Sequence, residues 1–326
     1  MKNPLLYPKR TPDEEGYLSV GQNHCLYYQR HGDRDKYPVV YLHGGPGGGC
    51  SFEEYRYFDP DHYCVILFDQ RGAGKSLPYA ETRHNTPNDL IADLEKLRYH
   101  FGFKKWAIYG GSWGSSLAML YALAHPQRVT RMILRGIFFA DYRGACYITE
   151  ENGAAKTYKN IYYADYRDFC LKYHPDSSTL LHSLYKCVFD DNQKTALKAA
   201  KLFDLWDTSI AFYDNADKHL QAIAQNPQNS LALARIFTHY ACNFYSEDMR
   251  YYLLNGMASF THRVDILHGQ QDYICPLENA TTLHGVLRNS HLYIVDKCGH
   301  SQTEPLLQNA LIKITDQRKS EENDVI

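Results

Sequence analysis

Short, continuously apolar runs separated by amphipathic segments dominate the first 140 residues of this chain. The runs at residues 39–42, 65–68, 106–109 and 132–134 are typical of strands that are buried on both faces. Residues 1–36 instead alternate polar and apolar positions, which predicts an antiparallel hairpin at a sheet edge. Strands that alternate with helices predict a parallel sheet covered by helices on both faces.

The segment between the second and third apolar runs carries strong helix signals. Thr86 is a suitable N-cap, Pro87 stands at the first helical position and Asp89 falls in the first turn, as helix starts favour. Gly102 can end the helix. The apolar positions recur at helical spacing, at Leu90, Ile91, Leu94, Leu97 and Phe101.

The pattern changes near residue 138, after which helical periodicity and dense aromatic residues replace the strand runs as far as residue 255. Strand-like runs return at residues 264–267 and 292–295. We interpret this as one α/β domain interrupted by a helical insertion. The predicted boundaries are residues 1–137 and 251–326 for the α/β domain and residues 138–250 for the insertion.

Composition and charge exclude several function classes. The 326 residues are 44% hydrophobic with a formal net charge of −2, so no basic surface for nucleic acid or anionic membrane is expected. No apolar stretch is long enough to span a bilayer, and residues 1–10 do not resemble a signal peptide. The nine cysteines contain no C-x-x-C pair, which favours free thiols in a reducing cytosol. We predict a cytoplasmic protein with a frayed tail at residues 316–326.

A serine stands at the centre of a G-x-S-x-G pattern, Gly-Gly-Ser-Trp-Gly, at residues 110–114. An apolar run precedes the pattern, and an apolar helical segment that stops at Pro126 follows it. A nucleophile elbow has this order because the serine sits on a sharp, crowded turn from strand to helix, which needs small residues two positions away on each side. The context predicts that Ser112 is a nucleophile rather than part of a flexible loop.

A serine nucleophile needs a histidine that takes its proton and a carboxylate that orients the histidine. After a nucleophile elbow, the acid and the histidine follow in that order on loops beyond strands. Asp272 stands just past the first of the two late strands, and His300 lies in the loop after the second. We predict these two residues as partners of Ser112, with Asp296 as the competing acid because it also stands at a strand end.

A tetrahedral intermediate needs backbone N–H groups that stabilise its oxyanion. One is expected from Trp113, directly after the nucleophile, and another from the glycine-rich residues 43–49, His-Gly-Gly-Pro-Gly-Gly-Gly. That loop lacks the G-x-G-x-x-G spacing of dinucleotide sites, and Gly74-Lys75-Ser76 lacks the first P-loop glycine because Asp69 occupies its position. No acidic, cysteine or histidine cluster has metal-ligand spacing. We predict no cofactor and no metal.

With these motifs in place, the chain resembles the proline iminopeptidase (prolyl aminopeptidase) family of α/β-hydrolases. The resemblance runs from about residue 5 to residue 312. It implies an α/β-hydrolase fold with a mostly parallel, doubly wound sheet and an inserted helical cap over the active site. The matching segments are HGGPGGG at residues 43–49, FDQRGAGKS at 68–76, GGSWGS at 110–115, LRGIF at 134–138 and CPLENA at 275–280.

Position by position, the resemblance implies a catalytic triad of Ser112, Asp272 and His300. It implies oxyanion donors at Trp113 and Gly45, to which we add the neighbouring Gly44.

The resemblance also implies how a substrate is recognised, and here the chain departs from the family. In the family, two glutamates of the cap hold the charged amino end of the substrate, because a buried carboxylate can pair with an ammonium group. Residues 199–207 match the family's A-A-K-x-x-x-x-W-E segment, with Asp207 in place of the glutamate. Residues 234–240 match an A-R-I-E-x-H-Y segment, with Phe237 in place of the second glutamate.

Phe237 therefore weakens the predicted recognition of the amino end. Glu150 and Glu151, near the start of the insertion, are candidates for the missing charge, although solvated surface glutamates are the alternative interpretation. Phe138 completes the set of candidate substrate-binding residues.

The resemblance implies a cytosolic serine aminopeptidase that releases N-terminal proline from peptides or small molecules through an acyl-enzyme. Phe237 leaves open a small-molecule esterase or amidase on the same scaffold, because a neutral substrate needs no second acid. A non-catalytic binding protein is the third alternative, and the complete order of triad and oxyanion elements argues against it.

Overall fold

The computed structural model describes residues 6–317, and the predicted tail therefore lies largely outside the described residues. An eight-stranded sheet forms its centre, in the order β1-β2-β4-β3-β5-β6-β7-β8. Strands β3 to β8 are mutually parallel, whereas β2 pairs antiparallel with both β1 and β4. The strands are β1 (Glu14–Gly21), β2 (His24–His31), β3 (Tyr37–Leu42), β4 (Tyr63–Phe68), β5 (Trp106–Gly111), β6 (Val129–Arg135), β7 (Arg263–Gly269) and β8 (Ser290–Val295).

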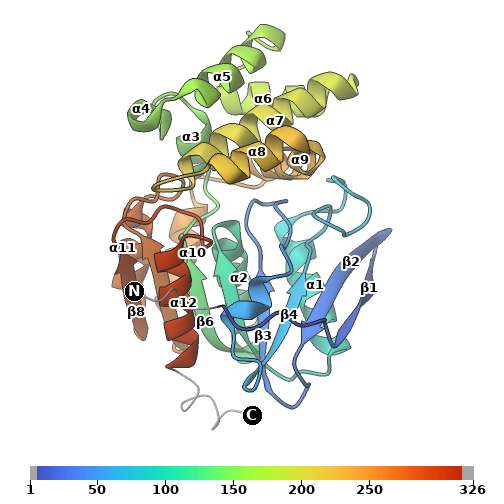
Figure 1. Cartoon of the computed structure of the whole chain (residues 1–326), viewed down its shortest axis with the longest axis vertical. Helices are drawn as coiled ribbons and strands as arrows, with labels where there is room; N and C mark the ends of the chain where they lie inside the picture. Colours follow the sequence, from blue (N-terminus) through green and yellow to red (C-terminus); the bar gives the residue numbers. More distant parts are fainter. Residues whose placement is uncertain (1–5, 318–326) are drawn as a thin grey trace.

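Helices cover both faces of this sheet, as the alternating pattern predicts (Figure 1). One buried cluster joins one face of the sheet to α1, α2 and α11, and a second joins the other face to α12. The predicted N-terminal hairpin is confirmed as β1 and β2 at the sheet edge. The helices that cover the two faces are α1 (Pro87–His100), α2 (Trp113–Ala124), α10 (Met249–Met257), α11 (Leu277–Val286) and α12 (Pro305–Asp316).

The start of α1 confirms the helix signals in the sequence. The Thr86 hydroxyl accepts a hydrogen bond from the Asp89 N–H, and the Asp89 carboxylate accepts one from the Thr86 N–H. This reciprocal pair satisfies two N–H groups that the first helical turn leaves without an acceptor. Gly102 follows the helix with a positive φ of 77°, a conformation that favours glycine.

Helices α3 to α9 of the described chain form a layer above the sheet, which we call the helical layer (Figure 1). It consists of α3 (Tyr142–Thr149), α4 (Ala155–Tyr158), α5 (Ile161–Tyr173), α6 (Leu180–Val188), α7 (Gln193–Ile210), α8 (Asp217–Gln225) and α9 (Gln228–Asn243). Most of its buried apolar side chains share one cluster with the sheet, so the two layers pack directly on each other. Helix α10 begins within two residues of the predicted boundary and packs on α2 and α11.

A buried ion pair holds the loop after β4 against α1. Arg71 donates through Nε to one Asp93 oxygen at 2.6 Å and through Nη2 to the other at 2.8 Å, and both side chains are at most 2% exposed. Arg71 also donates to the side chain of Gln22 and the carbonyl of His84. This network positions the loop that follows the Asp-Gln-Arg-Gly segment.

We expect Asp93→Ala to lower the free energy of unfolding by about 3–5 kcal/mol, because it leaves the Arg71 charge buried without its main partner. Urea denaturation followed by circular dichroism measures the change. The exposed Asp35 supplies the control, since Asp35→Ala should change stability by less than about 0.5 kcal/mol. Equal unfolding midpoints for the two variants would contradict this role of the pair.

Candidate active site

Ser112 stands at the turn between β5 and α2. β5 ends at Gly111 and α2 begins at Trp113, so Ser112 alone makes the turn, with φ 57° and ψ −125°. A non-glycine residue in this region costs on the order of 1–3 kcal/mol, and such strain clusters at functional sites. A Cβ at Gly110 would overlap the carbonyl oxygen of Gly114. The small residues around the serine are therefore required by the closeness of the backbones.

His300 and Asp272 meet beyond the ends of two neighbouring strands. Asp272 lies three residues after β7, and His300 lies five residues after β8. His300 Nδ1 is 2.7 Å from Asp272 Oδ2, and the other Asp272 oxygen accepts hydrogen bonds from the N–H groups of Ile274 and Cys275. The competing Asp296 is exposed and accepts a bond from Gln271 instead. The structure thus brings Asp272, and not Asp296, to His300.

The surroundings of this pair favour a charged aspartate and a neutral histidine. Burial raises the pKa of Asp272, but His300, His268 and the Cys275 N–H stabilise the carboxylate, and the net effect is a lowered pKa. Burial lowers the pKa of His300, and the Asp272 charge offsets only part of that effect. At neutral pH, His300 is therefore a free base with Nδ1–H donated to Asp272.

The glycine-rich loop after β3 lies against the nucleophile. A Cβ at Gly44 would come within 3.1 Å of the Ser112 Cβ. The buried His43 holds the loop, because its Nδ1 donates to the Gly44 carbonyl at 2.9 Å and its Nε2 accepts from the Gln70 N–H at 2.9 Å. Burial lowers the pKa of His43 to about 4, so the ring is neutral and can make both bonds.

The two residues predicted to supply oxyanion donors, Trp113 and Gly45, both lie near Ser112. Trp113 is the first residue of α2, and N–H groups in a first helical turn have no acceptor within the helix. Gly45 lines the same cavity as Ser112. Both residues belong to segments that pack on the serine, so the predicted donors lie on the side of the cavity where the nucleophile stands.

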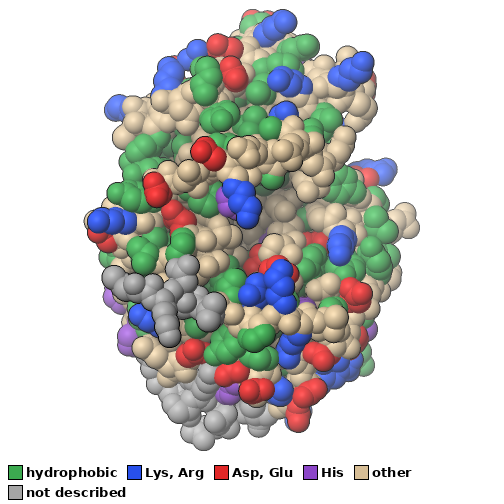
Figure 2. Space-filling view, in the orientation of Figure 1, with side chains coloured by type: hydrophobic (Ala, Val, Ile, Leu, Met, Phe, Trp, Pro, Cys, Tyr) green, Lys and Arg blue, Asp and Glu red, His purple; other side chains and the backbone are tan. Residues whose placement is uncertain are grey.

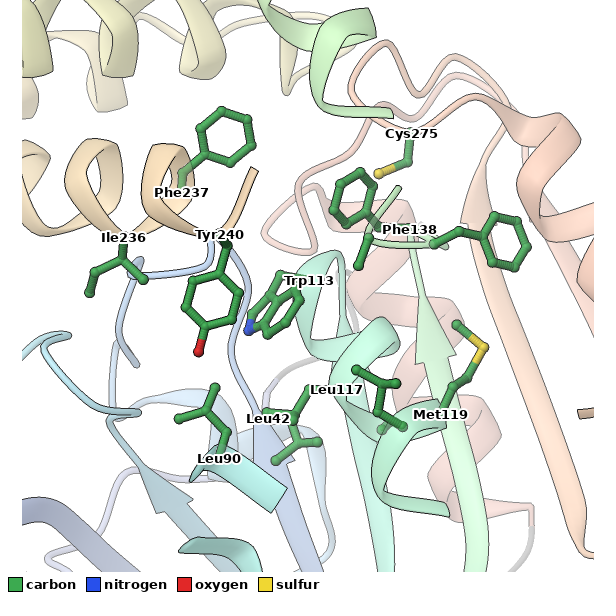
Figure 3. Close-up of a cluster of buried hydrophobic side chains, with 14 of the residues drawn as sticks. Leu42, Leu90, Trp113, Leu117, Met119, Phe138, Ile236, Phe237, Tyr240 and Cys275 are labelled. Atoms are coloured by element: carbon green, nitrogen blue, oxygen red, sulfur yellow. The ribbon is translucent and has the colours of Figure 1, made fainter. Parts of the chain in front are cut away.

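A cavity of about 470 Å³ contains Ser112 and His300. It lies between the sheet and the helical layer, where the face drawn in Figure 2 is hollowed. Figure 3 shows Phe237 extending from α9 and Phe138 from the segment after β6, with Trp113 at the start of α2. The apolar part of the cavity wall includes Phe138, Ile148, Phe203, Leu233, Phe237 and Ile274.

The predicted substrate-binding residues divide into two groups. Phe138, Asp207 and Phe237 line the cavity. Glu150 lies elsewhere, because its carboxylate accepts hydrogen bonds from the N–H groups of Leu180 and Leu181 at the start of α6. Glu151 is exposed and forms an ion pair with Lys159 at 2.6 Å. The structure does not bring Glu150 or Glu151 to the nucleophile.

Among the cavity residues that were not identified from the sequence are Asp204, Ile274 and Arg135. Asp204 is one helical turn before Asp207 on α7, within the matching segment but at a position that the family pattern leaves open. Ile274 follows Asp272 by two residues and forms part of the apolar wall. The buried Arg135 donates to the carbonyl oxygen of His300 at 2.7 Å and so holds the histidine loop. The Leu-Arg-Gly-Ile-Phe segment was the signal that could have identified Arg135.

Comparison with known proteins identifies relatives over nearly the whole chain. The pattern of the α/β hydrolase fold family matches residues 37–304. A proline iminopeptidase of Xylella fastidiosa (strain 9a5c) is 39% identical over 314 residues, which cover 95% of this chain and 98% of that protein. A proline iminopeptidase of Arabidopsis thaliana is 37% identical and covers 97% of this chain and 82% of the relative.

Solved structures confirm the α/β-hydrolase fold. An esterase from Exiguobacterium antarcticum superimposes with a TM-score of 0.63 over 94% of this chain and 98% of its own, at 20% sequence identity. VinJ superimposes with a TM-score of 0.65 over 95% of this chain and 99% of its own, at 16% identity.

Proposed function

The chain belongs to the proline iminopeptidase family of α/β-hydrolases, and from this membership we propose that it is a serine aminopeptidase releasing N-terminal proline from peptides. The observation that carries the proposal is the cavity lined by Ser112, His300 and the carboxylate of Asp207, with Asp272 hydrogen-bonded to His300. Such a cavity combines an acyl-transfer site with a negative group for a substrate amine.

In the proposed acylation step, Ser112 Oγ attacks the carbonyl carbon of the N-terminal residue. His300 Nε2 takes the hydroxyl proton, while Asp272 holds Nδ1–H and stabilises the imidazolium that forms. The backbone N–H groups of Trp113 and Gly45 donate to the oxyanion. The intermediate collapses when His300 returns the proton to the leaving amine, so that the C–N bond breaks and an ester to Ser112 remains.

In the proposed deacylation step, water attacks the ester carbonyl as His300 takes its proton. Collapse of the second tetrahedral intermediate returns the proton to Ser112 Oγ and releases the free amino acid. The two steps use the same groups.

We assign substrate selection to the helical layer as a cap, with residues 138–250 as its proposed extent. Helix α7 contributes Asp207 to the cavity wall, and α9 contributes Phe237. Phe237 is 2% exposed and stacks on Phe203 with ring centroids 5.2 Å apart. Together with Phe138, these rings supply an apolar surface suited to a pyrrolidine ring.

A small-molecule esterase or amidase is the second candidate, favoured by the phenyl ring of Phe237 in the cavity wall. A panel of prolyl-, alanyl- and N-acylprolyl-arylamides and short acyl esters separates the two functions. The aminopeptidase proposal expects the highest kcat/KM on the free prolyl-arylamide. Preference for N-acylated or ester substrates would contradict it.

A cytosolic location remains a prediction. The nine cysteines are free thiols, and no helix in the described part of the chain is long and apolar enough to cross a membrane.

We expect Asp207→Asn to lower kcat/KM for prolyl-arylamide by about 10-fold or more, because a charge-assisted hydrogen bond is worth about 1.5–3 kcal/mol. Hydrolysis of a neutral acyl ester should change by less than about 2-fold, since that substrate has no ammonium. Steady-state kinetics on both substrates measure the effect. Equal losses on the two substrates would argue against a role of Asp207 in amine recognition.

A further inference from the structure

Helix α7 contributes a second carboxylate to the cavity wall, Asp204, at a position where the family pattern requires none. Asp204 and Asp207 are three residues apart on α7 and both line the cavity that contains Ser112. Residues at this spacing lie on the same face of a helix. The end of α7 is attached to the histidine loop, because the Ala211 carbonyl accepts hydrogen bonds from the N–H groups of His300 and Ser301, both at 2.8 Å. The two carboxylates are therefore held in a defined position relative to His300.

Neutral donors position Asp204 without neutralising it. One of its oxygens accepts a hydrogen bond from the Ser230 hydroxyl at 2.6 Å, and the other accepts one from Thr208 at 3.4 Å. Among the described residues, no lysine, arginine or histidine is a main cause of the pKa shift of Asp204 or Asp207. The charged groups that act on Asp207 are both anions, Asp204 and Asp272.

Two like charges in a partly desolvated cavity are costly unless a cation joins them. Burial, with a contribution from Asp204 and Asp272, raises the pKa of Asp207 to about 7. Burial also raises the pKa of Asp204, although its bonds to Ser230 and Thr208 oppose the shift. A secondary ammonium such as that of an N-terminal proline has two N–H donors, one for each carboxylate.

Resting on the function proposed above, we propose that Asp204 is a second acid of the amino-end site, so that Asp204 and Asp207 on one face of α7 together bind the substrate ammonium. The second charge thus comes from α7, where the family takes it from the helix that here carries Phe237. At the position of the family's second glutamate, Phe237 makes an apolar contact instead and stacks on Phe203. Glu150 and Glu151 are not needed for this role.

The test measures ligand binding without turnover. In a Ser112→Ala background, calorimetric titration compares L-prolinamide, which carries the ammonium, with N-acetyl-L-prolinamide, which does not. Asp204→Asn keeps the size of the side chain and an acceptor for Ser230. We expect it to raise the Kd for prolinamide by about 10-fold or more, as removal of a charged hydrogen-bond partner does, and to leave binding of the N-acetyl compound unchanged. Asp168→Asn is the matched control, because Asp168 is exposed on α5 and its one ion-pair partner within residues 6–317 is Arg167.

A second readout separates a direct role from a structural one. In the enzyme with Ser112 intact, KM for prolyl-arylamide should fall as pH rises through the pKa of Asp207, because the carboxylate form binds the amine. Asp204→Asn removes a neighbouring negative charge, so the pKa of Asp207 should fall and the midpoint of this profile should move to lower pH. The other titratable side chains on the cavity wall are Tyr41, His43, Glu54, Arg135, His219 and His300.

The outcomes distinguish this proposal from the function on which it rests. If the parent binds prolinamide and cleaves prolyl-arylamides but Asp204→Asn changes neither the Kd nor the pH midpoint, the role of Asp204 is overturned and the aminopeptidase function stands. Equal weakening for both ligands would show a structural effect and would also overturn it. A parent that neither binds prolinamide nor cleaves prolyl-arylamides overturns both proposals.

Discussion

Ser112→Ala is expected to lower kcat for prolyl-arylamides by roughly three orders of magnitude or more, because it removes the nucleophile on which the acyl-enzyme depends. The fold should persist, since alanine differs from serine at this turn only by the hydroxyl oxygen. Release of the arylamine, followed spectrophotometrically, measures the loss. Circular dichroism and the urea midpoint show whether the variant is folded.

Ser259→Ala supplies the control for this experiment. Ser259 is exposed after the end of α10, and its replacement should leave kcat unchanged within about 2-fold. A folded Ser112→Ala protein with the activity of this control would remove Ser112 from the mechanism.

The second large effect is expected from Asp272→Asn, which should reduce kcat by about 10⁴-fold, because an amide in place of the orienting carboxylate favours the wrong histidine tautomer. Asp296→Asn is the matched variant, since Asp296 also follows a strand end but is exposed and bonded to Gln271. It should retain nearly full activity. Parallel kinetics on the two proteins decide the question, and the opposite ranking would make Asp296 the acid.

Local sequence patterns were sufficient to predict the architecture. Apolar runs, helical spacing and the capping signal at Thr86 act over a few residues, so they indicate strands and helices without knowledge of the fold. The β5–Ser112–α2 turn was predicted for the same reason, because the glycines at 110 and 114 reflect a steric demand of that turn. Local patterns do not give the order of the strands in the sheet, and the structure shows it to be β1-β2-β4-β3-β5-β6-β7-β8.

Distances between loops and the orientation of helix faces were decided by the tertiary structure. Asp272 and Asp296 both follow strand ends, and only the packing of the loops after β7 and β8 places Asp272 2.7 Å from His300. Spacing along a helix shows that Asp204 and Asp207 share a face, but not that this face borders the cavity. Glu150 carries the negative charge that binding of a substrate amine needs. In the structure, however, its carboxylate accepts hydrogen bonds from N–H groups at the start of α6. The sequence by itself thus determined the elements and the order of the reactive residues, whereas long-range packing decided which carboxylates face Ser112.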